Sequence, residues 1–290
     1  GDAAVDPSKA VISTLPVVGE VPFSYGQLGD KVLTCSNIGG LYEFDGKGFR
    51  TIREPTIGES FQVYSMLNYY DKLLLGQYPT GMLFEYDGEK LSLLSGWPPK
   101  LEGVSGSSRE AQTTTIYGGE LYVGVWPWGE LWRYSPDAAR WSFVTRLFTH
   151  PPLTAETTHP YENECKALGI VLNDWGQRVT SLIPWGDSLI ASTSAKWPRK
   201  WEPAFDFLAD GKWMEYGAVT RLTTPGSLSV PVRCTPEPTE LRFTLGSDGL
   251  SITQDGELLG TAALAPDVAA AIAAGELGDV TWGEGIFGAY

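Results

Sequence analysis

The stretch FQVYSMLNYYDKLLLGQYPTGMLFEYDGEKLSLL, from Phe61 to Leu94, divides into four short runs in which apolar and polar residues alternate. Turn-forming residues separate the runs at Asp71, at Pro79-Thr80-Gly81 and at Asp87-Gly88-Glu89. Alternation with a period of two is typical of strands that bury one face, and Asp-Gly pairs favour tight hairpins because they tolerate positive φ. The stretch therefore predicts four antiparallel strands joined by hairpins.

The same pattern recurs along the chain. Three further units run from Phe23 to Ile52, from Glu110 to Val144 and from Arg178 to Tyr216. Equivalent positions at Lys31, Lys72, Glu120 and Ser188 are 41, 48 and 68 residues apart, and the last spacing contains an insertion. Asp-Gly pairs at 45–46, 87–88 and 210–211 fall between the third and fourth expected strands. A period of about 40 to 50 residues indicates a repeated four-stranded unit.

These units resemble β-propeller repeats of the kelch-like kind, over about Phe23 to Leu222 and at the level of the fold. The resemblance implies an all-β propeller of four-stranded blades. We expect residues 1–222 to form blades one to four, with the stretch KAVISTLP before unit one as an N-terminal strand that closes the ring.

Residues 223–290 differ from the repeats. The segment ELRFTLGSDGLSITQDGELLG resembles a hairpin of laminin-G or concanavalin-like sandwiches, but 68 residues are short for such a domain. We therefore predict a fifth blade, giving five in total, or a small β-rich extension. The following APDVAAAIAAGELG predicts a short helix, with Pro266 in its first turn and Gly275 as its C-terminal cap.

Charge and apolar content exclude two classes of partner. Lys and Arg total 21 against 35 Asp and Glu, so the net charge of −14 repels nucleic acid. No run approaches the roughly 18 apolar residues that a membrane span needs, so we expect no membrane insertion. The N-terminal GDAAVDPSKAV lacks the features of a signal peptide, and we expect a secreted or cell-surface protein whose signal has been removed.

The cysteines leave two alternatives open. Cys35, Cys165 and Cys234 are too few and too widely spaced for a disulfide framework or a zinc cluster. One disulfide with one free thiol and three buried free thiols are both compatible with the sequence. We predict no cofactor, although propellers can hold a structural calcium ion.

The propeller resemblance implies that the loops joining strands two and three, and those joining blades, share one face. These loops are rich in aromatic and polar residues. Indole rings match the apolar face of a sugar, and polar groups bond its hydroxyls. The expected substrate-binding residues are Gln62, Tyr78, Trp126, Trp128, Asn173, Asp174, Lys196 and Trp197. The competing interpretation is that each tryptophan packs between loops as part of the structure.

The catalytic candidates come from a long loop and from the inner strands. The loop FTHPPLTAETTHPYENECKALGIVLNDWGQ holds His159 and Tyr161, residue types that serve as general acids or bases. Gln62, Glu110 and Arg178 each precede the equivalent position of their unit by ten residues, which places them at the start of three successive inner strands. Glu110, His159, Tyr161 and Arg178 are the predicted catalytic residues; a buried ion pair between Glu110 and Arg178 that joins blades is the alternative.

These features predict a carbohydrate-active protein that binds a polysaccharide or oligosaccharide on the loop face, either a glycoside hydrolase or a polysaccharide lyase. A hydrolase would need two carboxylates flanking the scissile bond, and the candidates are Glu110 with Glu162 or Asp174. A lyase would use His159 or Tyr161 as base and Arg178 to neutralise a uronate. The alternative is a non-catalytic propeller module, lectin-like or protein-binding, because a fold does not determine a function.

Overall fold

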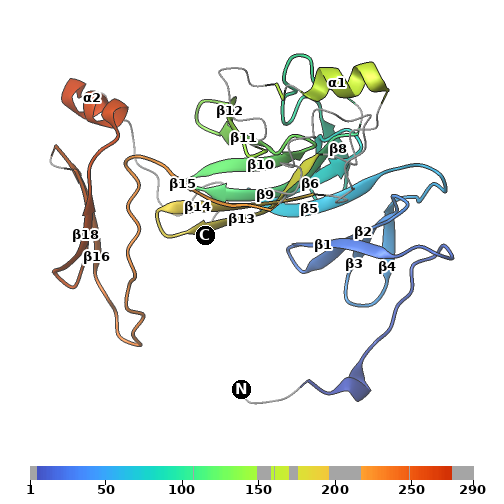
Figure 1. Ribbon diagram of the computed structural model, residues 1–290. Helices are drawn as coiled ribbons and strands as arrows, with labels where there is room; N and C mark the ends of the chain where they lie inside the picture. Colours follow the sequence, from blue (N-terminus) through green and yellow to red (C-terminus); the bar gives the residue numbers. More distant parts are fainter. Residues whose placement is uncertain are drawn as a thin grey trace.

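The computed structural model describes residues 5–106, 108–148, 158–159, 161–169, 176–195, 217–247 and 249–275, which contain five antiparallel sheets (Figure 1). Each sheet is a meander, in which strands that follow one another in sequence pair side by side. We call the first four sheets blades one to four, in sequence order.

Three blades have four strands each. Blade one contains β1 (Pro22–Leu28), β2 (Lys31–Ser36), β3 (Leu41–Phe44) and β4 (Phe49–Arg53). Blade two contains β5 (Gln62–Tyr69), β6 (Lys72–Tyr78), β7 (Leu83–Tyr86) and β8 (Leu91–Leu94). Blade three contains β9 (Glu110–Tyr117), β10 (Glu120–Trp126), β11 (Glu130–Ser135) and β12 (Arg140–Arg146).

The remaining elements are two three-stranded sheets and three short helices. Blade four contains β13 (Gln177–Trp185), β14 (Ser188–Ala195) and β15 (Val219–Thr223). The fifth sheet contains β16 (Leu241–Gly246), β17 (Gly249–Gln254) and β18 (Glu257–Ala262). The helices are the 3-10 helix η1 (Pro7–Lys9), α1 (Tyr161–Leu168) and α2 (Pro266–Ala274).

The expected register of the repeat is confirmed. Lys31, Lys72, Glu120 and Ser188 each begin the second strand of their blade. A two-residue turn joins the first strand to the second in every blade, because these positions pair with Leu28, Tyr69, Tyr117 and Trp185. The turn chemistry of the sequence therefore sets the pairing of the strands.

Apolar side chains between neighbouring blades form three cores. Leu33, Cys35 and Leu41 of blade one pack on Phe61, Val63, Leu73, Leu75 and Tyr86 of blade two. Tyr69, Leu74 and Leu83 of blade two pack on blade three at Ala111, Ile116, Leu121, Val123, Val125 and Trp132. Tyr117, Tyr122, Leu131 and Leu147 of blade three pack on blade four at Val179, Leu182, Leu189 and Ala191. Each of the first three blades thus packs one face against the next blade.

A glycine at one repeated position lets adjacent blades pack closely against each other. A Cβ at Gly76 would lie 2.4 Å from the carbonyl oxygen of Ala111, and one at Gly124 would lie 2.4 Å from the Cβ of Val179. Both glycines stand four residues after the start of the second strand, and both meet the inner strand of the following blade. Glycine at this position is therefore a packing requirement.

The inner strands β1, β5, β9 and β13 contact one another in order. Successive four-stranded meanders packed face to face through their inner strands are the architecture of a β-propeller. The protein is therefore an all-β chain of the propeller class, and its five sheets agree with the five blades expected from the sequence.

Two parts of the chain differ from expectation. The third strand of blade four is β15, which begins at Val219, beyond the end of the fourth unit defined from the sequence. The Asp-Gly pair at 210–211 lies outside the described residues. Residues 10–21 form no strand, and in Figure 1 the fifth sheet stands apart from blade one, so it offers them no edge to pair with. The closing strand and the domain boundaries remain predictions.

The expected C-terminal helix is confirmed as α2. Pro266 opens the helix, where a missing backbone donor costs nothing. Gly275 caps its end with φ 71°, in the left-handed region that favours glycine, and its N–H donates to the carbonyl of Ile272.

Candidate functional site

The best-defined polar contact lies between the starts of β9 and β13. Arg178 donates from Nε to Oε2 of Glu110 at 2.9 Å and from Nη2 to Oε1 at 3.0 Å. The Glu110 side chain is fully buried, and that of Arg178 is 19% exposed. This two-pronged geometry is the strongest that a guanidinium and a carboxylate can form, and it ties blade three to blade four.

Tyr64 on β5 extends this contact to blade two. Its hydroxyl donates to Oε1 of Gln62 at 2.9 Å and accepts from Nη2 of Arg178 at 3.5 Å. The guanidinium carbon of Arg178 lies 5.4 Å from the centre of the Tyr64 ring. Burial, together with the charge of Glu110, raises the pKa of Tyr64 well above its usual value, so the phenol stays protonated.

A row of aromatic rings continues from Tyr64. The ring of Tyr78 lies 6.5 Å from that of Tyr64 and 6.5 Å from that of Trp126. Tyr64 and Tyr78 are half-buried, whereas Trp126 is fully buried. We call the resulting group the inner-strand cluster: Gln62, Tyr64, Tyr78, Glu110, Trp126 and Arg178.

A second group surrounds the start of α1. His159 stacks on Trp128 with ring centres 4.4 Å apart and lies 4.7 Å from the ring of Phe148. Its Nδ1 accepts from the backbone N–H of Tyr161 at 3.2 Å, which satisfies a donor at the start of the helix. His159 is 1% exposed and Tyr161 is also buried, so both side chains belong to the packing beneath α1.

Glu162 fixes α1 to the rest of the molecule. Its fully buried carboxylate accepts from Nε1 of Trp128 at 2.6 Å and from the backbone N–H of Ser105 at 2.9 Å. Nζ of Lys166, one turn later in the helix, lies 3.2 Å from the same carboxylate. We call this group the helix cluster: Trp128, Phe148, His159, Tyr161 and Glu162.

A further buried ion pair joins Arg109, directly before β9, to Glu130 at the start of β11 in blade three. Nη2 of Arg109 lies 3.6 Å from Oε2 of Glu130, which also accepts from Nε1 of Trp132 at 2.9 Å. Burial raises the pKa of Glu130 and lowers that of Arg109, because each charge has lost its water. This pair was not predicted from the sequence, and its partners lie at the starts of β9 and β11, two strands apart in blade three.

The predicted site residues that the structure describes lie in two separate clusters. Gln62, Tyr78, Trp126, Glu110 and Arg178 lie in the inner-strand cluster, and Trp128, His159 and Tyr161 lie in the helix cluster. Asn173, Asp174, Lys196 and Trp197 lie outside the described residues. The catalytic and binding roles of all these residues remain predictions.

The tryptophans differ from expectation in one respect. We expected Trp126 and Trp128 to present their rings to a ligand, but both are buried. The Trp128 indole is held by His159 on its face and by Glu162 at its nitrogen. This is the packing role that was the competing interpretation for such residues.

Tyr64 was missed among the site residues, and Glu162 was considered only as a second carboxylate beside Glu110, although the sequence held a signal for the position of each. Tyr64 follows Gln62 by two positions, so the period of two in a strand places both on one face. Glu162 and Lys166 have the spacing of four that pairs opposite charges on a helix.

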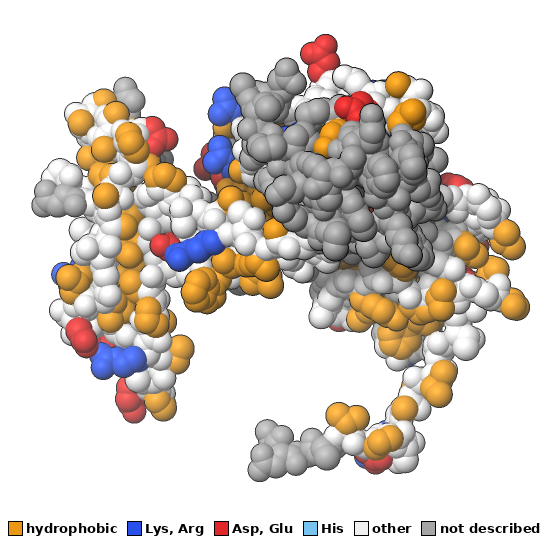
Figure 2. Space-filling view, viewed as in Figure 1, with side chains coloured by type: hydrophobic (Ala, Val, Ile, Leu, Met, Phe, Trp, Pro, Cys, Tyr) orange, Lys and Arg blue, Asp and Glu red, His pale blue; other side chains and the backbone are white. Residues whose placement is uncertain are grey.

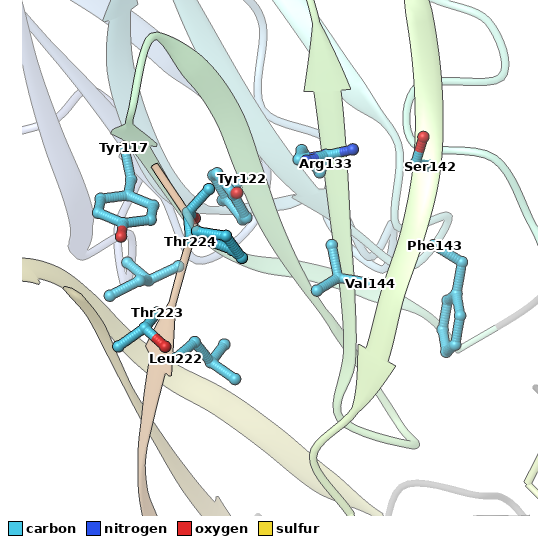
Figure 3. Close-up of a pocket in the computed structure, with 11 residues that line it drawn as sticks. Tyr117, Tyr122, Arg133, Ser142, Phe143, Val144, Leu222, Thr223 and Thr224 are labelled. Carbon is cyan, nitrogen blue, oxygen red and sulfur yellow. The ribbon is translucent and has the colours of Figure 1, made fainter. Parts of the chain in front are cut away.

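A cavity of about 310 Å³ lies between blades three and four (Figure 3). Its walls are mainly apolar, and they include Tyr117, Tyr122, Val144, Leu189 and Leu222. Arg133 also lines it, with its charge already paired to Glu120 at 3.3 Å. A second cavity of about 500 Å³ lies between residues 13–20 and blade one.

Three further observations concern metal binding, membrane-spanning helices and the cysteines. Across the described part of the chain, no group of His, Cys, Asp and Glu side chains has an arrangement that would hold a metal ion. Within the same residues, no helix has the length and apolar character needed to cross a membrane. The three cysteines are free thiols, with Cys35 and Cys165 buried and Cys234 exposed.

The blades and the inner-strand cluster together define a β-propeller protein with a polar and aromatic group at the start of its inner strands. No family model and no curated protein matches the chain. Among solved structures, it is similar to BamB from Moraxella catarrhalis, with 14% identity over 82% of this chain and 59% of BamB at a TM-score of 0.35. It is also similar to YjhT, with 11% identity over 75% of this chain and 70% of YjhT at a TM-score of 0.35. The chain thus spans about three fifths of the BamB chain.

Proposed function

We propose that this protein is a non-catalytic propeller module that binds a partner polypeptide at the inner-strand cluster. The main observation in favour of the proposal is that two predicted catalytic side chains, Glu110 and His159, are buried. Glu110 is buried against Arg178, and His159 is buried between Trp128 and Phe148. A general acid or base must come within hydrogen-bond reach of a substrate proton, which neither buried group does in this arrangement.

The accessible part of the cluster supports a polypeptide partner. Tyr64 and Tyr78 are half-buried, so part of each ring reaches solvent beside Gln62 and Arg178. Tyrosine and arginine are the residue types that contribute most at protein interfaces. The net charge of −14 favours partners with basic segments through long-range attraction.

Carbohydrate binding is the second candidate function. A half-exposed tyrosine ring beside an amide is a surface on which a sugar can stack, which is the observation in its favour. Two features count against a uronate or sulfate ligand: Glu110 already neutralises Arg178, and the indoles of Trp126 and Trp128 are buried. Kelch-like blades, a laminin-G-like fifth sheet and a location outside the cytoplasm also remain proposals.

Binding of a random peptide library and of a glycan array to the immobilised protein tests the proposal. We expect retention of peptides enriched in Lys and Arg, lost on Tyr78→Ala and kept on Tyr25→Ala, a control for an exposed tyrosine of blade one. Retention of glycans, with no peptide retained, would contradict the proposal and support the lectin-like interpretation.

A further inference from the structure

The cavity of about 310 Å³ between blades three and four has walls from both blades (Figure 3). Blade three supplies Tyr117, Tyr122 and Val144, and blade four supplies Leu189 and Leu222. Leu189 is fully buried, and the two tyrosines are 7% and 5% exposed. Figure 2 shows hydrophobic side chains along the fifth sheet, where they lie on an open surface. A ligand in the cavity instead contacts apolar walls from two blades.

The preceding interface, between blades two and three, is filled by aromatic side chains. Trp132 and Tyr134 of β11 and Trp141 and Phe143 of β12 pack in or against the core between these two blades. The ring of Tyr134 lies 5.2 Å from that of Trp141, and the ring of Trp132 lies 5.4 Å from that of Phe143. The third and fourth strands of blade three thus supply two pairs of rings to this interface.

Blade four lacks rings at the matching positions of its third strand. Leu222 pairs with the second residue of β14 and Tyr134 with the second residue of β10, so the two positions are equivalent. By the same register, Thr220 is the counterpart of Trp132. The residues directly after β15 form a turn instead of a fourth strand, and they line the cavity. The cavity therefore lies where the preceding interface holds aromatic rings.

Arg133 gives the cavity a polar edge that differs from the equivalent positions of the other blades. Blades one and two carry Glu43 and Glu85 at this third-strand position, each paired with the Lys that begins the second strand, at 3.2 and 2.6 Å. Blade three reverses the pair, because Glu120 begins β10 and meets Nη1 of Arg133 at 3.3 Å. A guanidinium has five N–H donors, so this contact leaves others that can bind a ligand.

The charges around the cavity favour an uncharged ligand. Glu120 neutralises Arg133, and the net charge of −14 repels anions at long range. The hydroxyls of Ser142 and Thr224 also line the cavity, and Figure 3 shows Thr224 beside Tyr122. Burial raises the pKa of Tyr122, so its hydroxyl stays protonated. These groups can donate to or accept from a phenol hydroxyl, and the hydroxyls can accept from an indole N–H.

We propose that the cavity between blades three and four binds a small, uncharged aromatic molecule of the phenol or indole class. The ring lies between Tyr122, Val144 and Leu222, and its polar group meets the hydroxyls and Arg133. An apolar cavity of about 150 Å³ holds benzene, so about 310 Å³ is enough for two fused rings. The residues that line the cavity include no member of the inner-strand cluster, so this site is separate from the proposed function.

Isothermal titration of the whole chain with indole tests the site. We expect saturable binding, and we expect the charged analogue indole-3-carboxylate to bind on the order of tenfold more weakly, because burying its charge is costly. Leu222→Trp places a ring at the position equivalent to Tyr134, so it should fill the cavity and weaken indole binding on the order of tenfold or more. Leu258→Trp is the matched control, since it adds the same ring at an exposed position of the fifth sheet.

Val144→Phe fills the cavity from the opposite wall, so it tests the site even if Leu222→Trp does not fold. Tyr78→Ala should leave indole binding unchanged, because Tyr78 belongs to the inner-strand cluster and not to the cavity. Three results would each overturn the proposal: no saturable binding of indole to the wild type, binding that survives in every filling variant that folds, or equal binding of the carboxylate.

Discussion

Arg178 at the start of β13 binds the buried carboxylate of Glu110 at the start of β9 through two hydrogen bonds of 2.9 and 3.0 Å. The pair joins two blades at the point where their inner strands meet, and Tyr64 joins it from a third blade. Glu110 and Arg178, two of the predicted catalytic residues, therefore also join neighbouring blades in this structure.

Arg178→Ala should destabilise the protein strongly. It leaves the fully buried Glu110 carboxylate without this cation, and loss of one partner of a buried pair costs about 3 to 5 kcal/mol. Urea unfolding followed by tryptophan fluorescence measures the change. Arg242→Ala is the control, because Arg242 pairs with Glu240 at the exposed surface and its loss should change stability little. Equal effects of the two substitutions would contradict the structural role of the inner pair.

Gly124→Ala tests how closely the blades pack. The added Cβ would lie 2.4 Å from the Cβ of Val179 on blade four, so the blades must separate, at a cost of about 1 to 3 kcal/mol. Gly48→Ala, in the open turn of blade one, has no neighbour within 4 Å and should leave stability almost unchanged. Thermal unfolding of both variants and of the wild type measures the two changes in stability. Equal stability of the two variants would contradict the close packing at Gly124.

The three thiols should differ sharply in reactivity. Burial raises the pKa of Cys35 to about 11 and that of Cys165 to about 12, so near neutral pH both are inaccessible and protonated. Cys234 is exposed. We expect one fast-reacting thiol per native chain with an aromatic disulfide reagent, and three in urea. More than one fast thiol in the native protein, or a fast thiol that persists in Cys234→Ser, would contradict this assignment.

Glu162→Ala should loosen α1 without unfolding the blades. The substitution removes the acceptor for the indole of Trp128 and for the backbone N–H of Ser105. Each buried donor left without a partner costs about 1 to 3 kcal/mol. Hydrogen exchange should accelerate at the amides of α1 and stay slow in β9 and β10. Asn163→Ala, at an exposed position of the same helix, is the control and should leave exchange almost unchanged.

The turn residues and the alternation of apolar and polar residues made much of the fold predictable from the sequence. The two-residue turns and the alternation of each unit determine the strand register, so the alignment of Lys31, Lys72, Glu120 and Ser188 follows from the sequence. The same register places Glu110 and Arg178 at matching positions of successive inner strands, where they meet as an ion pair. The extent of blade four was not predictable, because β14 ends at Ala195 and β15 begins only at Val219, and spacing alone cannot locate a strand so much farther along the chain than in the other blades.

Burial of the candidate site was less predictable. Whether Trp128 faces a ligand or the interior depends on where α1 lies, and α1 is positioned by long-range contacts of Glu162 with Trp128 and Ser105. Nothing in the local sequence around Trp128 encodes that contact. Tyr64, by contrast, follows from strand periodicity alone and could have been found.

The most direct test of the non-catalytic account is to incubate the purified wild-type protein with a panel of neutral and uronate-containing polysaccharides. New reducing ends report hydrolysis, and the ultraviolet absorbance of unsaturated products reports elimination. The account predicts that neither signal rises above that of a heat-denatured sample. Cleavage by the wild type that is abolished by Glu110→Gln or His159→Gln, with the fold retained, would contradict it.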